Sequence, residues 1–182
     1  MRKVPLILED AQKLVEGLEI YLKGLYEIGE RGFTIQIVQG HLGQFITART
    51  YLEKGYKVWW THPDYDLQVE GIGRIEVKTA KCWSDDGKSD ANVFGLKLDR
   101  FDIFGLVLID NHNVPFKIFS IPKDELKECE KPHDYVVGNK QSPSFVYYNP
   151  EGLRHSEKEG YEIYSIERKV ALQEEPYLLW SR

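Results

Sequence analysis

The chain has 182 residues, of which 42% are hydrophobic and 29% charged, the composition of an ordinary globular domain with a sizeable core. Its net charge of -5 argues against a protein that binds nucleic acid through overall positive charge, although acidic residues can mask a local basic groove. Two cysteines, Cys82 and Cys129, form no C-x-x-C pair, which excludes a zinc ribbon and a disulfide framework.

We expect no secretory signal peptide and no membrane-spanning segment. Residues 1–10 lack the apolar core of a signal peptide, and no apolar run reaches the length that spans a bilayer. Two lone cysteines suit a reducing compartment. We therefore expect a cytoplasmic protein that makes no contact with a membrane.

Helical periodicity dominates the first third of the chain. Residues 8–31 carry apolar side chains at helical spacing and predict an amphipathic helix. A short β-prone run at 34–38 predicts a strand. Residues 41–54 predict a second helix, which Gly55 ends, and residues 56–60 predict another strand.

Strand patterns dominate the middle of the chain. A hairpin follows, with strands at 65–69 and 74–80 around the turn Gly71-Ile72-Gly73. The patterns that come next predict, in chain order, a polar loop at 84–90, a strand at 92–98, an apolar central strand at 101–109, a turn at 110–113, a strand at 116–121 and a short helix at 122–126. Beyond residue 129 the patterns weaken and indicate strands at 146–148 and 161–164 and a last helix that begins at 165 and breaks at Pro176.

The order of two helices followed by about five strands is typical of an α/β domain with a mixed central sheet flanked by helices. We expect a single domain, with a core at about 34–128, an N-terminal helical element at 1–33 and a C-terminal extension at 129–182.

The predicted hairpin brings charged side chains together. Glu76 and Lys78 are two residues apart on one strand, so their side chains point to the same face, and Asp66 opens the neighbouring strand. Two carboxylates beside a lysine can hold a hard divalent cation and activate a water molecule. Asp64 is an alternative to Asp66 as the carboxylate that comes from the neighbouring strand. We favour Asp66 because it begins the apolar strand.

Asp66 followed by Glu76-Val77-Lys78, with the literal dipeptide Pro63-Asp64, resembles the PD-(D/E)XK nuclease superfamily, which has the restriction-endonuclease-like fold. The order of helix, strand, hairpin and further strand is similar as well. The supporting motifs are Gly40-x-x-Gly43, Gly55-Tyr56-x-Val58, Tyr65-Asp66-Leu67, Ile75-Glu76-Val77-Lys78-Thr79 and Phe101-Asp102-Ile103. The resemblance covers roughly residues 38–126.

The resemblance implies a DNA endonuclease that uses magnesium, or manganese in its place, leaves 5′-phosphates and needs no organic cofactor. It implies metal ligands at Asp66 and Glu76, with the Val77 carbonyl as a third ligand. Lys78 would orient or deprotonate the attacking water. Many relatives carry a glutamate where this chain has Gln44, an amide that adds no charge. A homodimer is compatible, since cutting both strands with one site per chain usually needs two copies.

Other interpretations stay open at this stage. The charged trio could be a surface hairpin with a cross-strand salt bridge, and Gln44 an ordinary exposed helix residue. Thr79, Lys81 and Trp83 follow the site and could contact a phosphate backbone. The protein could also be a catalytically silent DNA-binding module on the same fold, which Gln44 and the negative net charge favour, or an RNA-processing nuclease.

Overall fold

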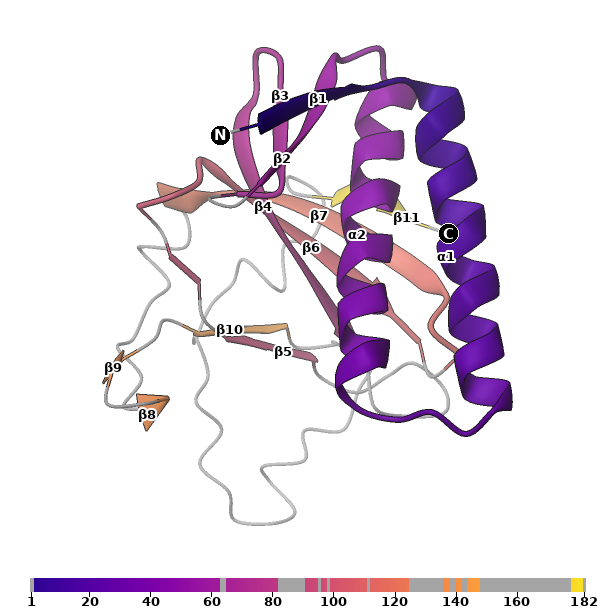
Figure 1. Ribbon diagram of the computed structural model, residues 1–182. Coiled ribbons are helices and arrows are strands. Elements are labelled where there is room, and N and C mark those ends of the chain that lie inside the picture. Colours follow the sequence, from indigo (N-terminus) through magenta and orange to yellow (C-terminus); the bar gives the residue numbers. More distant parts are fainter. Residues whose placement is uncertain are drawn as a thin grey trace.

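The computed structural model describes residues 2–62, 65–81, 91–94, 96–97, 99–110, 112–124, 136–137, 140–141, 144–147 and 178–181. These residues form a mixed α/β arrangement, in which a seven-stranded sheet has a pair of helices packed on one side (Figure 1). The helices are α1 (Leu8–Glu27) and α2 (Phe33–Glu53), and they run antiparallel as a hairpin. Neither of them is long and apolar enough to cross a membrane.

The large sheet has the strand order β1-β2-β3-β4-β6-β7-β11, and its neighbouring pairs are antiparallel except for β4 and β6. Its strands are β1 (Arg2–Leu6), β2 (Val58–His62), β3 (Leu67–Val69), β4 (Gly73–Lys81), β6 (Ile103–Ile109), β7 (Pro115–Pro122) and β11 (Leu178–Ser181). Two antiparallel pairs lie outside it: β5 (Ala91–Phe94) with β10 (Ser144–Tyr147), and β8 (Val136–Val137) with β9 (Lys140–Gln141).

The hairpin of β3 and β4 forms where the sequence predicts it. Leu67 lies opposite Ile75, and both side chains are fully buried. Gly71 and Gly73 close the turn with φ angles of 75° and 125°, in the left-handed region that favours glycine. A side chain at Gly73 would also come within 3.0 Å of the Asp102 carboxylate, so this turn is specific for glycine on two counts.

The predicted central strand is also confirmed. Six consecutive residues of β6, from Phe104 to Ile109, are buried, as expected for a strand covered on both faces. On one side β6 pairs in parallel with β4, and on the other it pairs antiparallel with β7.

Residues 34–38 belong to α2, so the strand predicted there is wrong. Ile35, Val38 and Leu42 recur at helical spacing, and all three are buried in the core that α2 shares with the sheet. Tertiary burial of this apolar face outweighs the β propensity of the run. The predicted second helix therefore begins earlier than expected, with Gly32 as its N-terminal cap.

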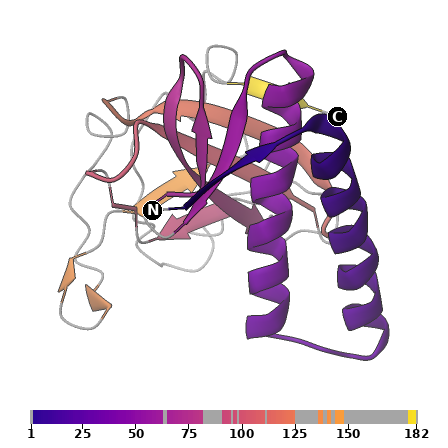
Figure 2. The same ribbon diagram turned by 45° about the horizontal axis from the view of Figure 1, so that its top comes forward.

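Helix α2 approaches β4 closely at Gly43, and both views show the helical pair standing against the sheet (Figures 1 and 2). A Cβ atom on Gly43 would overlap the Thr79 hydroxyl, which donates a hydrogen bond to the Gln39 carbonyl at 3.0 Å. The β-branched threonine has few alternative rotamers, so it cannot move aside without losing that bond. The contact brings the α2 residues Gln39 and Gln44 to the second half of β4.

The sequence patterns do not predict the outer strands β1 and β11, which pair with β2 and β7. The strand expected at 146–148 corresponds to β10. The loop expected at 84–90, the strand at 161–164 and the helix from 165 lie outside the described residues.

Candidate active site

Asp66 lies at the start of β3, where β3 and β4 separate. Its backbone N–H donates to the Ile75 carbonyl at 3.1 Å, so the residue still touches β4 at this point. Strand β4 continues to Lys81 and pairs there with β6. At the opposite edge of this part of β4, the Asp66 side chain contacts the Val77 backbone and Gln44 of α2. We call the point where β3 and β4 separate, with these residues, the fork.

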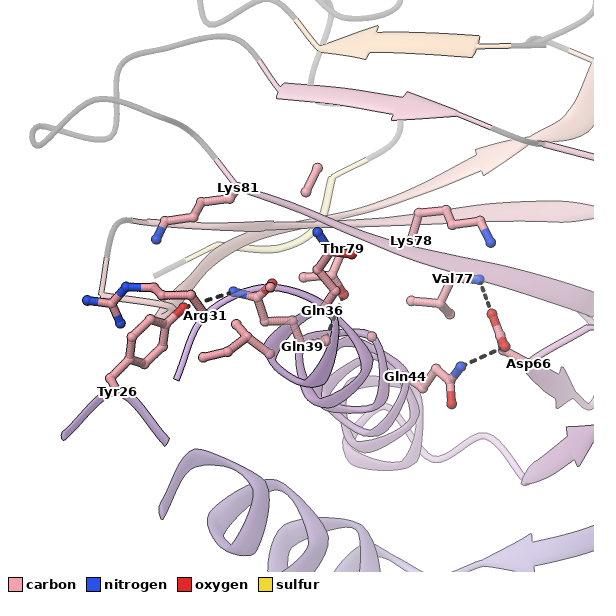
Figure 3. Close-up of a pocket in the computed structure, with 14 residues that line it drawn as sticks. Tyr26, Arg31, Gln36, Gln39, Gln44, Asp66, Val77, Lys78, Thr79 and Lys81 are labelled. Atoms are coloured by element: carbon pink, nitrogen blue, oxygen red, sulfur yellow. Dashed lines mark hydrogen bonds between the residues drawn. The ribbon is translucent and has the colours of Figure 1, made fainter. Parts of the chain in front are cut away.

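Both carboxylate oxygens of Asp66 accept a hydrogen bond at the fork. Gln44 Nε2 donates to Asp66 Oδ1 at 2.7 Å, and the Val77 backbone N–H donates to Asp66 Oδ2 at 2.7 Å (Figure 3). The Asp66 side chain thus takes the place that a neighbouring strand would occupy on Val77. The two bonds hold the carboxylate in one orientation.

Gln44 is itself held in place by two neighbours. Its Oε1 accepts a hydrogen bond from the Trp60 indole at 3.2 Å and lies 3.3 Å from His41 Nδ1. These contacts leave the amide N–H₂ directed at Asp66, which fixes the orientation of the amide. Gln44 is therefore half-buried and holds the Asp66 carboxylate, rather than lying exposed on the surface of α2.

The charges at the fork interact strongly. Burial raises the pKa of Asp66 from its usual value of 3.8 to about 6, and the neighbouring Glu76 carboxylate adds to the rise. The Val77 N–H and the Lys78 ammonium oppose it. Lys78 Nζ donates to Glu76 Oε1 at 2.6 Å, and these side chains are 34% and 18% exposed. Two carboxylates thus share one ammonium, so an added cation would favour the ionised form of Asp66.

The fork opens into a groove of about 1010 Å³ between α2 and the second half of β4. Four of the predicted site residues line one end of it, namely Gln44, Asp66, Val77 and Lys78 (Figure 3). Glu76 is next to this end through its ion pair with Lys78 but is not part of the lining.

The fork has a donor set that suits a hard cation, although the described residues include no group of three His, Cys, Asp or Glu side chains placed to hold a metal. Asp66 and Glu76 supply two carboxylates. Each Asp66 oxygen accepts one hydrogen bond and keeps a free lone pair. The Val77 carbonyl points to the same side of the extended strand as its N–H, toward Asp66. Magnesium accepts a few such oxygens and completes its shell with water.

No protein-family model matches the chain, and no curated protein matches it either. The case for a function therefore depends on the geometry of the fork and the groove.

Sequence reasoning missed the residues that support the site. Trp60 and His41 orient Gln44, and His41 could have been found from its spacing, because residues three apart on a helix are neighbours. Tyr26 and Arg31 line the far end of the groove, but no local pattern relates them to the hairpin. Asp64 and Trp83, which the sequence analysis considered, lie outside the described residues.

Proposed function

We propose that this protein is a metal-dependent endonuclease that hydrolyses phosphodiester bonds in DNA. The observation that carries the proposal is the fork, where the Asp66 carboxylate is held against the Val77 amide, beside Glu76 and Lys78, at one end of a groove. This constellation, on a mixed sheet with a helix across the hairpin, resembles the PD-(D/E)XK superfamily and its restriction-endonuclease-like fold.

Asp66, Glu76 and the Val77 carbonyl would hold a magnesium ion, or manganese in its place. When bound, such an ion supplies positive charge to a phosphate oxygen and lowers the pKa of a coordinated water. The raised pKa of Asp66 supports this assignment, because a site that disfavours its own ionised carboxylate in the absence of metal gains most from a cation.

The chain's own side chains divide the remaining tasks. Gln44 holds the Asp66 carboxylate in position without adding charge. Lys78 places its ammonium beside Glu76, where it would face the phosphate and the attacking water. A lysine suits this place because its compact charge responds readily to neighbouring ions.

A plasmid-nicking assay tests the proposal. Supercoiled DNA is incubated with the protein and magnesium or manganese, and the loss of supercoils is followed over time. Glu76→Gln and Lys78→Met should each slow nicking by at least about 100-fold, the scale of losing a catalytic group. Glu70→Gln is the matched control, since Glu70 lies on the same hairpin, is 57% exposed and pairs with Lys57. Nicking that survives both fork substitutions would remove these residues from the mechanism.

A second candidate is a catalytically silent DNA-binding module on the same framework. It is favoured by Gln44, which stands where a further carboxylate would assist metal binding, and by the two hydrogen bonds that already engage Asp66. Retained DNA binding without nicking in either metal would support this candidate. Labelled RNA in a parallel reaction distinguishes a ribonuclease from both.

A further inference from the structure

The end of the groove away from the fork is positively charged. Arg31 lies in the turn between α1 and α2, and Lys81 is the last residue of β4. Both side chains lie over the ring of Tyr26, with the Arg31 guanidinium carbon 5.4 Å and Lys81 Nζ 6.0 Å from the ring centroid. Figure 3 shows the two cationic groups converging at this end, opposite Asp66.

We call the Tyr26 ring that lies under these two cations the Tyr26 platform, and hydrogen bonds hold it in place. The Tyr26 hydroxyl donates to Asn113 Oδ1 at 3.1 Å, and Gln39 Nε2 donates to the same oxygen. Asn113 is buried and adopts a left-handed conformation with φ of 62°, in the turn that leads to β7. The ring therefore joins α1, α2 and the sheet, and it holds the two cations in place before any ligand arrives.

The groove lining differs in charge from the protein as a whole. Its described residues include the cations Arg31, Lys78 and Lys81 and one acidic side chain, Asp66. The whole chain, in contrast, has a net charge of -5. Uncharged polar side chains such as Gln36 and Gln39 lie between the two ends. Lys78 is paired with Glu76, whereas Arg31 and Lys81 place two cationic groups side by side at one end of a concave surface, an arrangement that favours an anionic ligand there.

The length of the groove fits a nucleic-acid strand. Lys81 lies four residues along β4 from Val77 at the fork, which corresponds to ~13 Å of β-strand. A strand of a DNA duplex winds around the axis as it rises, so its successive phosphates are ~7 Å apart and this length spans about two nucleotides. A strand with one phosphate at the fork would thus bring another to Arg31 and Lys81.

We infer that Arg31 and Lys81, on the Tyr26 platform, form a binding subsite for a backbone phosphate about two nucleotides from the bond that is cut. The inference rests on the proposed function, and it assigns the α1–α2 turn a role in binding the substrate. A guanidinium can grip a phosphate through two parallel hydrogen bonds, and the lysine adds a point charge. Phosphate contacts of this kind position a duplex without reading its sequence.

Binding without cleavage tests the subsite. A fluorescently labelled 24-base-pair duplex is titrated in EDTA across a series of salt concentrations, and affinity is measured by anisotropy. Each lost phosphate contact lowers the slope of log affinity against log salt by ~0.9, so the double variant Arg31→Gln/Lys81→Gln, which removes both groups from one phosphate, should lose about 0.9 from this slope. Arg31→Lys keeps the charge and should retain most of the slope while affinity falls.

The matched control is Lys13→Gln/Lys57→Gln, which removes the same charge from two exposed side chains outside the groove lining. This control should leave the slope within about 0.3 of the wild-type value. Equal losses of salt slope in the two double variants would overturn the subsite, because such losses would reflect only the overall charge of the protein. Absence of DNA binding by the wild-type protein would overturn it as well.

The outcome for the subsite can be separated from that for the nuclease. A reduced slope in a protein that never nicks DNA would support the subsite and refute the catalytic proposal. Nicking by the wild-type protein, with an unchanged salt slope in Arg31→Gln/Lys81→Gln, would support the catalytic proposal and refute the subsite.

Discussion

Replacing Asp66 by asparagine should change how the stability of the metal-free protein depends on pH. In the unfolded chain Asp66 ionises near its usual pKa of 3.8, whereas the folded protein raises that pKa to about 6. Between these values the folded state binds more protons than the unfolded state, so the free energy of unfolding falls as the pH rises. This contribution is present in full below about pH 4 and is lost as the pH rises through about 6.

The size of the effect follows from the two pKa values. The full shift corresponds to about 3 kcal/mol, of which about 2 kcal/mol falls between pH 4.5 and pH 7.5. Asparagine keeps one acceptor and places an N–H₂ group against a donor, which adds a cost that does not vary with pH. The measured quantity is therefore the change with pH in the stability difference between Asp66→Asn and wild type.

Urea denaturation in EDTA, at half-unit steps from pH 4.5 to 8, measures this difference. The wild-type protein should lose about 2 kcal/mol relative to Asp66→Asn across the range. Glu70→Gln, which removes an exposed carboxylate from the same hairpin, should run parallel to wild type. Parallel profiles for wild type and Asp66→Asn would show that the fork does not perturb this carboxyl group, and the argument for a cation site would lose its electrostatic basis. Magnesium at pH 7.5 should stabilise wild type and not Asp66→Asn.

Three further substitutions test the surroundings of the site. Gly43→Ala should lower the free energy of unfolding by about 1–3 kcal/mol, since its Cβ would overlap a β4 side chain. The control Gly17→Ala, whose Cβ would have no atom within 4 Å, should raise the free energy of unfolding by up to about 1 kcal/mol. Equal effects of the two substitutions in urea denaturation would contradict the close contact between α2 and β4 at Gly43. Asp102→Asn should cost about 1 kcal/mol at neutral pH, because this part-exposed carboxylate accepts hydrogen bonds from Arg74 Nε at 2.9 Å and Nη2 at 2.8 Å, which hold the pKa of Asp102 well below its usual range. The stabilisation by the ionised Asp102 carboxylate is present above about pH 4 and is lost as the pH falls, so the stabilities of Asp102→Asn and wild type should converge in acid. A stability difference that does not change with pH would refute this prediction. Gln44→Glu should destabilise the metal-free protein at pH 7.5 by adding a carboxylate to the fork and should tighten magnesium binding in calorimetry; an unchanged affinity would argue that the fork holds no cation.

The parts of the fold that follow from local pattern could be predicted from the sequence. The β3–β4 hairpin is specified by alternating side chains around two glycines, and the strand spacing of Glu76 and Lys78 places them together. The run at 34–38 was mispredicted because its β-branched residues favour a strand, while its burial pattern belongs to a helix.

Long-range pairing escaped prediction for a physical reason. The edge strands β1 and β11 are short and are defined by partners far away in the sequence, so no local period identifies them. The sequence analysis placed Gly43 in the Gly40-x-x-Gly43 motif, but only the tertiary structure shows that this glycine lets α2 approach Thr79. The Tyr26 platform depends on three elements meeting, which only the tertiary structure defines.

The hydrogen bond from the Trp60 indole to Gln44 means that the fork contains its own fluorophore. Ionisation of Asp66, or arrival of a cation there, changes the field at the indole through one intervening amide. Titrations at the fork can therefore be followed by tryptophan emission in the unlabelled protein. A Trp60→Phe variant would identify the share that this one of the four tryptophans contributes to the signal.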